Sequence, residues 1–281
     1  MKSLLIRTAT GILFIAVIIA SILLSDVAFK AVFSVLFNVF LLFVCVALYE
    51  YRSLLMTQKI NLSLSFYVIS LLIYILTAYT DLWNANTIIP LLSVIFGLFL
   101  LLFVIELFRK QENPFAHIAY SVLGIVWIVL PLSLVNRIPT MFSDGKYLLL
   151  SIFIFVWMYD TFAYCVGSIW GKHRLMERIS PKKSWEGAVG AAFLTVGFAS
   201  FMPKIFPFLP LTVSQWTFFA LIIVVFATLG DLIESLFKRQ LSVKDSGNIL
   251  PGHGGILDRF DSIFFVIPFI IIYLIFMLTR I

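Results

Sequence analysis

Long apolar segments are the feature that most constrains how this 281-residue chain can fold. A helix needs about 20 mainly apolar residues to cross the hydrocarbon core of a membrane. Segments that meet this requirement run over residues 8–24, 29–48, 62–82, 88–108, 115–135, 147–170, 185–206, 215–237 and 260–278. Charged residues make up only 12% of the chain, whereas soluble domains carry roughly 25%. The sequence therefore predicts an all-α, polytopic integral membrane protein with about nine transmembrane helices.

The basic residues divide unequally between the two ends of these predicted helices. If the amino terminus is cytoplasmic, most Lys and Arg residues face the cytoplasm, and those left outside are Lys30, Arg137, Lys146, Lys204 and Arg280. Because cytoplasmic loops carry an excess of Lys and Arg, this asymmetry supports a cytoplasmic amino terminus and an odd number of spans. The net charge of +6 then reflects basic loops close to anionic lipids rather than a nucleic-acid-binding surface.

Two regions follow from the spacing of the spans. We expect residues 1–145 to form an N-terminal transmembrane region with spans one to five. Residues 146–281 should form a catalytic transmembrane region, in which the two long polar loops, 171–184 and 238–259, face the cytoplasm. Cys45 and Cys165 lie inside apolar stretches, so their placement implies neither a disulfide framework nor a zinc site.

Acidic residues occur where the lipid core disfavours them. These are Asp160 within a span, Asp231 and Glu234 near the end of another, and Asp258 and Asp261 at the start of the last. A charge inside a membrane costs several kcal/mol, which makes each of these residues a functional candidate. The spacing i, i+3 lets each pair share a helix face and offer oxygen ligands to one ion. The alternative is that these acids pair with Lys238, Arg239 or Arg259 at helix ends.

Both polar loops have features of phosphate-binding segments. In the first loop, Ser180 and Pro181 predict a turn, and Lys182, Lys183 and Ser184 precede a helix start, where backbone N–H groups favour anions. In the second loop, glycines surround His253, and cations flank carboxylates. The alternative is that these cations only set the membrane topology.

A long ordered motif spans the second loop. It comprises Ser235-Leu236-Phe237-Lys238-Arg239, Lys244-Asp245, Leu250-Pro251-Gly252-His253-Gly254-Gly255 and Leu257-Asp258-Arg259-Phe260-Asp261-Ser262. This motif resembles the hallmark segment of the phosphatidate cytidylyltransferases, also called CDP-diacylglycerol synthases. Asp160, Tyr164, Gly167, Gly171-Lys172 and the run from Ser180 to Gly187 are similar to the same family. One departure is Ser184, where the family more often has threonine, and it retains the hydroxyl group.

The resemblance implies that CTP and phosphatidic acid react to give CDP-diacylglycerol and pyrophosphate. It also implies a multi-pass protein of the bacterial inner membrane whose active site faces the cytoplasm. The implied partners are CTP, phosphatidic acid, membrane lipids and a second copy in a homodimer. The implied cofactor is Mg²⁺, with K⁺ as a candidate second ion, and the family places Asp231 and Asp258 at the metal centre.

We assign the candidate residues to three roles. Asp231, Asp258, Lys244 and Asp245 are catalytic candidates, and Asp160, Glu234 and Asp261 support the metal-binding pair Asp231 and Asp258. The candidates for binding substrate phosphates are Lys182, Lys183, Ser184, Lys238, Arg239, His253, Gly254, Gly255 and Arg259. Because the lipid phosphate is already an anionic nucleophile, catalysis should consist mainly of positioning and charge neutralisation.

Two other functional classes compete with this interpretation. A secondary transporter would carry its polar residues near the middle of the membrane, often within an inverted repeat, and the sequence shows no obvious internal repeat. A CTP-dependent polyprenol kinase or an archaeal CDP-lipid synthase would be closer in chemistry. The match over residues 235–262 argues against both.

Overall fold

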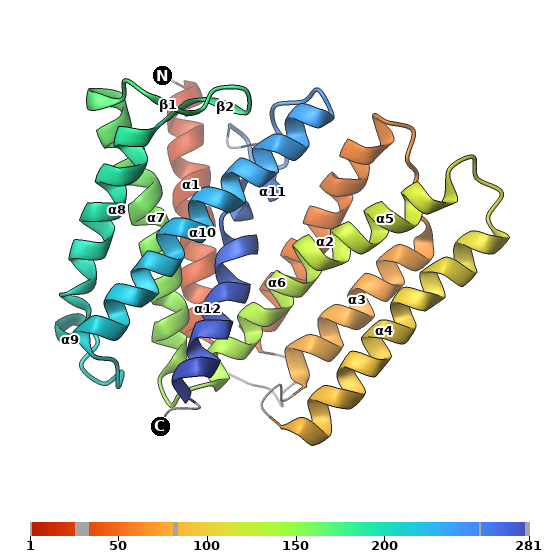
Figure 1. The fold of residues 1–281 in the computed structure, drawn as a ribbon, viewed down its shortest axis with the longest axis horizontal. Coiled ribbons are helices and arrows are strands. Elements are labelled where there is room, and N and C mark those ends of the chain that lie inside the picture. The colour runs from red at the N-terminus through yellow and green to blue at the C-terminus, as the bar shows by residue number, and fades with distance from the viewer. Residues whose placement is uncertain (1, 26–33, 81–83, 253, 279–281) are drawn as a thin grey trace. The chain divides into compact units, whose positions relative to one another are not determined.

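Helices make up most of the structure. The computed structural model describes residues 2–25, 34–80, 84–252 and 254–278. In the first half of the chain the elements are α1 (Lys2–Leu23), α2 (Val35–Met56), α3 (Leu64–Tyr79), α4 (Ala85–Phe108), α5 (Pro114–Gly124), η2 (Ile125–Val129), α6 (Leu130–Leu134) and η3 (Val135–Thr140). The remaining elements are α7 (Gly145–Trp170), β1 (Arg174–Met176), β2 (Ser180–Ser184), α8 (Trp185–Ala199), α9 (Met202–Ile205), α10 (Val213–Gln240), α11 (Leu257–Phe260) and α12 (Ile263–Leu278). Figure 1 shows these helices along the chain.

The chain forms two compact units. The first contains Met1–Arg137 and Asp245–Asp258, and the second contains Ile138–Lys244 and Arg259–Ile281. This division differs from the predicted regions 1–145 and 146–281, because the segment Asp245–Asp258 packs with the first unit. The two predicted polar loops therefore do not belong to one unit.

The lengths of the apolar helices support a multi-pass membrane protein. Six helical segments of the described chain are long and apolar enough to cross a membrane: Val35–Met56, Asn86–Phe108, Pro114–Thr140, Gly145–Trp170, Val213–Gln240 and Leu257–Met277. Three shorter apolar helices, Arg7–Leu23, Leu64–Tyr79 and Trp185–Ala199, coincide with the other predicted spans. The count of nine crossings thus stays a prediction, while the all-α, polytopic class is confirmed.

Hydroxyl groups fix the helix ends and contacts of the first unit. Ser34 accepts a hydrogen bond from the backbone N–H of Phe37 at 3.1 Å and so caps the start of α2. Deeper in the unit, the Tyr51 hydroxyl donates to the Tyr120 carbonyl at 2.8 Å, and the Tyr74 hydroxyl donates to the Phe37 carbonyl at 3.0 Å. Buried tyrosines need such partners, so these bonds specify which helices pack together.

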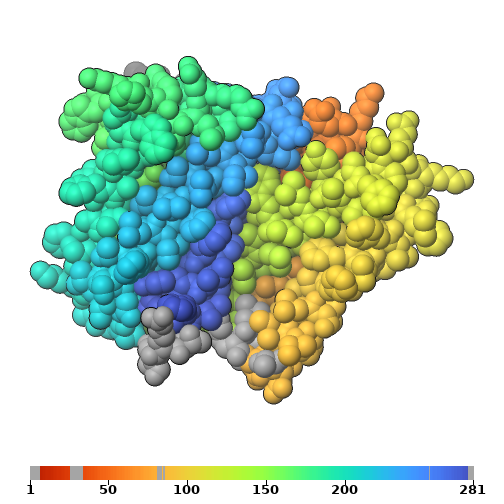
Figure 2. Space-filling view, in the orientation of Figure 1, coloured from red at the N-terminus to blue at the C-terminus, as the bar shows by residue number. Residues whose placement is uncertain are grey.

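In the second unit, α8 and α10 both pack against α7, and α12 packs against α10. Figure 2 shows α8 and α10 next to each other at the surface of this unit, in green and light blue. Aromatic side chains fill the contacts, with Phe155, Trp216 and Phe219 among the fully buried residues. The Tyr273 hydroxyl of α12 donates to the Gln215 carbonyl of α10 at 2.9 Å.

A short antiparallel hairpin connects α7 to α8, and the sequence did not predict it. Strand β1 pairs with β2, and Arg174 lies opposite Ser184. The turn occupies residues 177–179, so the predicted turn at Ser180 and Pro181 is wrong; both residues begin β2. The pairing places the lysines of β2 directly before α8.

Candidate active site

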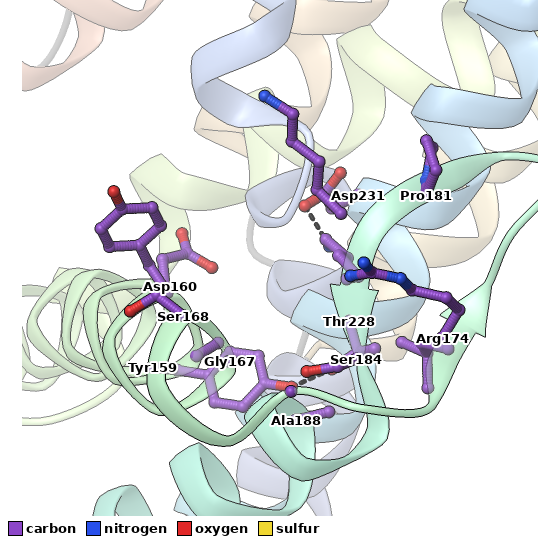
Figure 3. Close-up of a pocket in the computed structure, with 16 residues that line it drawn as sticks. Tyr159, Asp160, Gly167, Ser168, Arg174, Pro181, Ser184, Ala188, Thr228 and Asp231 are labelled. Carbon is purple, nitrogen blue, oxygen red and sulfur yellow. Dashed lines mark hydrogen bonds and ion pairs between the residues drawn. The ribbon is translucent and has the colours of Figure 1, made fainter.

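A cavity of about 550 Å³ opens in the second unit between α7, the hairpin, the start of α8 and α10. Its wall carries three cations, Arg174, Lys182 and Lys183, and two carboxylates, Asp160 and Asp231. Figure 3 shows how these elements supply the lining side chains. A cavity of this size holds a small ligand, and its mixture of charges suits an anion bound together with a cation.

One face of α7 forms much of this cavity. Asp160, Tyr164, Gly167 and Gly171 all line it, and their spacing returns to the same side of a helix at each turn. Glycines bring α8 close to this face. A Cβ atom on Gly187 would lie 2.9 Å from the Ala163 carbonyl oxygen and 3.0 Å from the Gly167 Cα. The close approach of α7 and α8 therefore requires glycine at position 187.

Asp231 and Lys183 form an ion pair across the cavity wall, drawn as a dashed line in Figure 3. The two side chains are 26% and 31% exposed, and such partial burial strengthens their attraction relative to a pair in open solvent. Ser235 also donates its hydroxyl to Asp231 Oδ1 at 3.3 Å. The predicted lysine and the predicted aspartate, which lie far apart in sequence, thus meet in one site.

The hairpin holds the loop cations in place before α8. Ser184 accepts a hydrogen bond from the Gly187 N–H at 3.1 Å and caps this helix. Glu186, in the first turn, accepts bonds from the backbone N–H groups of Lys172 and His173, both at 3.1 Å, and lies 2.6 Å from His173 Nδ1. The predicted helix start after Ser184 is confirmed. Ser184 both caps this helix and lines the cavity.

Two further predicted acids lie in the same unit. Glu234 is buried and forms an ion pair with Lys238, one helical turn away, at 2.6 Å. Asp261 lies within electrostatic range of Asp231, Glu234 and Asp160, and its Oδ1 accepts the Ser262 N–H at 2.6 Å. The pairing at a helix end that the sequence left open as an alternative therefore applies to Glu234.

The predicted cations at the end of α10 and after it have varied surroundings. Arg239 donates to the Ile179 carbonyl at 3.3 Å and to the Val243 carbonyl at 3.1 Å, so it ties the hairpin to the end of α10. Lys244 and Arg259 are exposed. None of these residues lines the cavity that contains Lys182 and Lys183.

Four of the predicted residues that the structure describes, Asp245, Gly254, Gly255 and Asp258, lie in the first unit, on the segment Asp245–Asp258. Among the described residues, Asp258 Oδ2 accepts hydrogen bonds from the Ser246 N–H at 2.9 Å, the Ser246 hydroxyl at 2.9 Å and the Gly255 N–H at 2.8 Å. Gly254 has φ +81°, a left-handed conformation that glycine adopts at no steric cost. Asp245 is exposed, and His253 lies outside the described residues.

Sequence reasoning missed several residues of the cavity. The hydroxyl oxygens of Tyr159 and Thr228 lie 2.5 Å apart and join α7 to α10. Arg174 adds a third cation from β1. The helical spacing from Asp160 to Gly171 was the available signal for the α7 face, whereas nothing in the sequence placed Thr228 next to Tyr159.

The carboxylates of the second unit suit a hard divalent cation. Asp160, Asp231 and Asp261 lie within electrostatic range of one another, and the Lys183 ammonium forms an ion pair with Asp231. Within the described residues, no three His, Cys, Asp or Glu side chains converge tightly enough to hold a metal by themselves. Mg²⁺ usually binds through one or two carboxylates together with water and substrate phosphates, so the donor set fits it.

Comparison with known proteins gives one consistent family. Residues 5–277 match the Cytidylyltransferase family. A phosphatidate cytidylyltransferase of Staphylococcus haemolyticus is 36% identical over 230 residues, covering 82% of this chain and 86% of that protein. The Staphylococcus aureus protein of the same name is 47% identical over 135 residues, covering 47% of this chain and 51% of its own length. One from Staphylococcus saprophyticus is 39% identical over 169 residues, covering 59% and 62% respectively. With the charged cavity on a polytopic helical scaffold, these matches show that the chain belongs to the cytidylyltransferase family.

Proposed function

We propose that this chain transfers the cytidylyl group of CTP to phosphatidic acid, giving CDP-diacylglycerol and pyrophosphate for phospholipid synthesis. The observation that carries the proposal is the cavity of the second unit, where Lys182, Lys183 and Arg174 lie on one wall with Asp160 and Asp231. The identity of the substrates is inferred from the family of the chain and from the names of its relatives. An apolar helical scaffold suits a reaction with one substrate in the lipid phase and one in water.

The cations of the hairpin are suited to the triphosphate. Lys182 is exposed and Lys183 is half-buried against Asp231, and both immediately precede the start of α8. Lysine ammonium groups neutralise phosphate charge, and the backbone N–H groups of a helix start also favour anions. We assign Lys182, Lys183 and Arg174 to the phosphates of CTP.

The chemistry requires little acid–base catalysis. A phosphatidate oxygen attacks the α-phosphorus of CTP, a new P–O bond forms, and the bond from the α-phosphorus to the bridging oxygen of the β-phosphate breaks. Pyrophosphate then leaves with the electron pair of that bond. The chain's contribution is to orient the two phosphates and to neutralise the charge that accumulates on the leaving group.

Asp231, supported by Asp160 and Asp261, is the part of the second unit that would hold Mg²⁺. When bound, the ion would supply Lewis-acid stabilisation to the phosphate oxygens. The ion pair with Lys183 would orient Asp231 before the metal and the nucleotide arrive. The roles of Asp258 as a metal ligand and of Lys244 and Asp245 as catalytic residues remain predictions. Binding of K⁺ as a second ion also remains a prediction.

The location of the reaction follows from the charge distribution. The lysines of the hairpin and the basic end of α10 belong to the predicted cytoplasmic side, where CTP is available. We therefore place the protein in the bacterial inner membrane with its active site facing the cytoplasm, and we retain the homodimer as a prediction. Cross-linking in native membranes tests the homodimer.

A direct assay tests the proposed activity. Purified protein in detergent would be incubated with CTP labelled in the α-phosphate and with phosphatidic acid. We expect the label to appear in CDP-diacylglycerol together with unlabelled pyrophosphate. A polyprenol kinase would instead convert CTP to CDP with no label in lipid, and an archaeal-type synthase would require an ether lipid in place of phosphatidic acid. A transporter would leave CTP intact, and any of these three results would contradict the proposal.

A further inference from the structure

A buried glutamate in α2 has no part in the site described so far. Glu50 is 2% exposed and lies within a helix long and apolar enough to cross a membrane. A carboxylate in such a place costs several kcal/mol unless it has specific partners, which makes it a functional candidate. In the described part of the chain, the donors that reach it all come from the segment Asp245–Asp258.

Three donors from this segment converge on the Glu50 carboxylate. The Ile256 N–H donates to Oε1 at 2.9 Å, and the Leu257 N–H donates to Oε2 at 2.9 Å. The Ser246 hydroxyl lies 3.3 Å from Oε2. Hydrogen bonds from backbone N–H groups to an ionised acceptor are among the strong ones, and here they hold a loop from a distant part of the sequence against α2.

The same loop carries Asp258, and the two carboxylates divide its donors between them. Asp258 Oδ2 accepts the Gly255 N–H, while the next two N–H groups go to Glu50. Ser246 contacts both carboxylates through one hydroxyl, at 2.9 Å from Asp258 and 3.3 Å from Glu50. A hydroxyl has a single proton to donate, so the position of this serine couples the orientation of Asp258 to that of Glu50.

The glycines of the loop are explained by the same carboxylate. A Cβ atom on Gly247 would lie 2.8 Å from Glu50 Oε1. One on Gly255 would collide with the Ser246 hydroxyl and the Glu50 carboxylate. Real Cβ contacts do not come this close, so the backbone surrounds Glu50 in a way that only glycine allows at both positions.

We infer that Glu50 is a positioning residue, which holds the segment Asp245–Asp258 on α2 and thereby orients Asp258 for the cytidylyl transfer. The inference rests on the proposed function for the role of Asp258, and on the hydrogen bonds alone for the anchoring of the loop. A glutamate that served only to stabilise the fold would have no need to share a donor, the Ser246 hydroxyl, with Asp258.

The test replaces Glu50 with an uncharged side chain of the same size. Glu50→Gln leaves one acceptor oxygen and places an amide donor against an N–H group of the loop. We expect the backbone amides of Ile256 and Leu257 to exchange hydrogen at least about tenfold faster, because each loses a charged partner. Exchange of the backbone amides of α2 should stay unchanged. The rate of CDP-diacylglycerol formation should fall about tenfold or more. Half of its maximal rate should require a higher Mg²⁺ concentration, because the resemblance places Asp258 at the metal.

A matched control comes from the same unit. Glu106 is also a buried glutamate on an apolar helix, but its partner is Arg109 rather than the loop. Glu106→Gln should leave both loop exchange and the Mg²⁺ requirement at the values of the unmodified protein. If Glu50→Gln fails to fold in detergent, Ser246→Ala provides a milder test, because it removes the shared hydroxyl and keeps both carboxylates. We expect it to shift loop exchange and the Mg²⁺ requirement in the same direction.

Three outcomes decide the matter. Local loss of protection in residues 245–258, together with the raised Mg²⁺ requirement, supports the inference. Unchanged loop exchange and unchanged kinetics in a folded Glu50→Gln protein overturn it, as does faster exchange throughout the first unit with an unchanged Mg²⁺ requirement. Failure of the unmodified protein to make CDP-diacylglycerol would overturn the proposed function, while local loss of protection would still support the anchoring of the loop.

Discussion

Lys183 combines the two interpretations that a basic residue near a membrane surface allows. Lys183 is predicted to lie on the cytoplasmic side, as expected of a residue that sets the membrane topology. Its ammonium group, however, forms an ion pair with Asp231, and the residue lines the cavity. A cation that served only to set topology would gain nothing from half-burial against a carboxylate. The ion pair therefore favours a role in binding.

Lys183→Gln should lower kcat/KM for CTP by about ten- to a hundredfold, because a hydrogen bond to a charged phosphate contributes roughly 1.5–3 kcal/mol. Membrane insertion should be normal. Lys204→Gln is the control, since Lys204 is an exposed lysine of the same unit in α9. Steady-state kinetics with varied CTP measure the effect. Equal kinetics for the two variants would return Lys183 to a purely topological role.

At the scale of elements, the cavity depends on how closely α7 and α8 approach each other. Gly187→Ala would push a Cβ atom against the Ala163 carbonyl and the Gly167 Cα. We expect it to destabilise the protein by about 1–3 kcal/mol, as overpacking does, and to reduce activity by deforming the cavity. Gly197→Ala, in the same helix, meets nothing within 4 Å and should be neutral or slightly stabilising. Thermal unfolding in detergent compares the two, and equal melting temperatures would contradict this account of the helix contact.

The sequence predicted elements better than it predicted their ends. Asp160 and Asp231 were found because a charge in an apolar segment stands out, and the structure brings both to one cavity. Glu50 was missed because the second span was predicted to end at residue 48, whereas α2 continues to Met56. The hairpin was not predicted because β1 is only three residues long and shows no alternation of apolar and polar residues. The assignment of Asp245–Asp258 to the first unit, while the flanking residues belong to the second, depends on tertiary contacts that no local sequence pattern reveals.

For the whole molecule, the central expectation is its orientation in the membrane. The hairpin before α8 should be cytoplasmic, and α9, which follows the other end of α8, should be external. Single cysteines at Lys182→Cys and Lys204→Cys test this in a background in which Cys45 and Cys165 are replaced by alanine. An impermeant thiol reagent added to intact cells should label only position 204. Labelling at position 182 from outside would reverse the topology.

The most direct test of the proposed active site is Asp231→Asn, measured as CDP-diacylglycerol formation across a Mg²⁺ titration. The change removes a charge and keeps the size of the side chain, so the variant should elute from size exclusion like the unmodified protein. If Asp231 holds the metal, the rate should fall by orders of magnitude, because metal stabilisation is worth several kcal/mol and about 1.4 kcal/mol is tenfold in rate. Asp144→Asn, at the other end of α7, should keep full activity. A folded Asp231→Asn protein with an unchanged rate and an unchanged Mg²⁺ dependence would contradict the account.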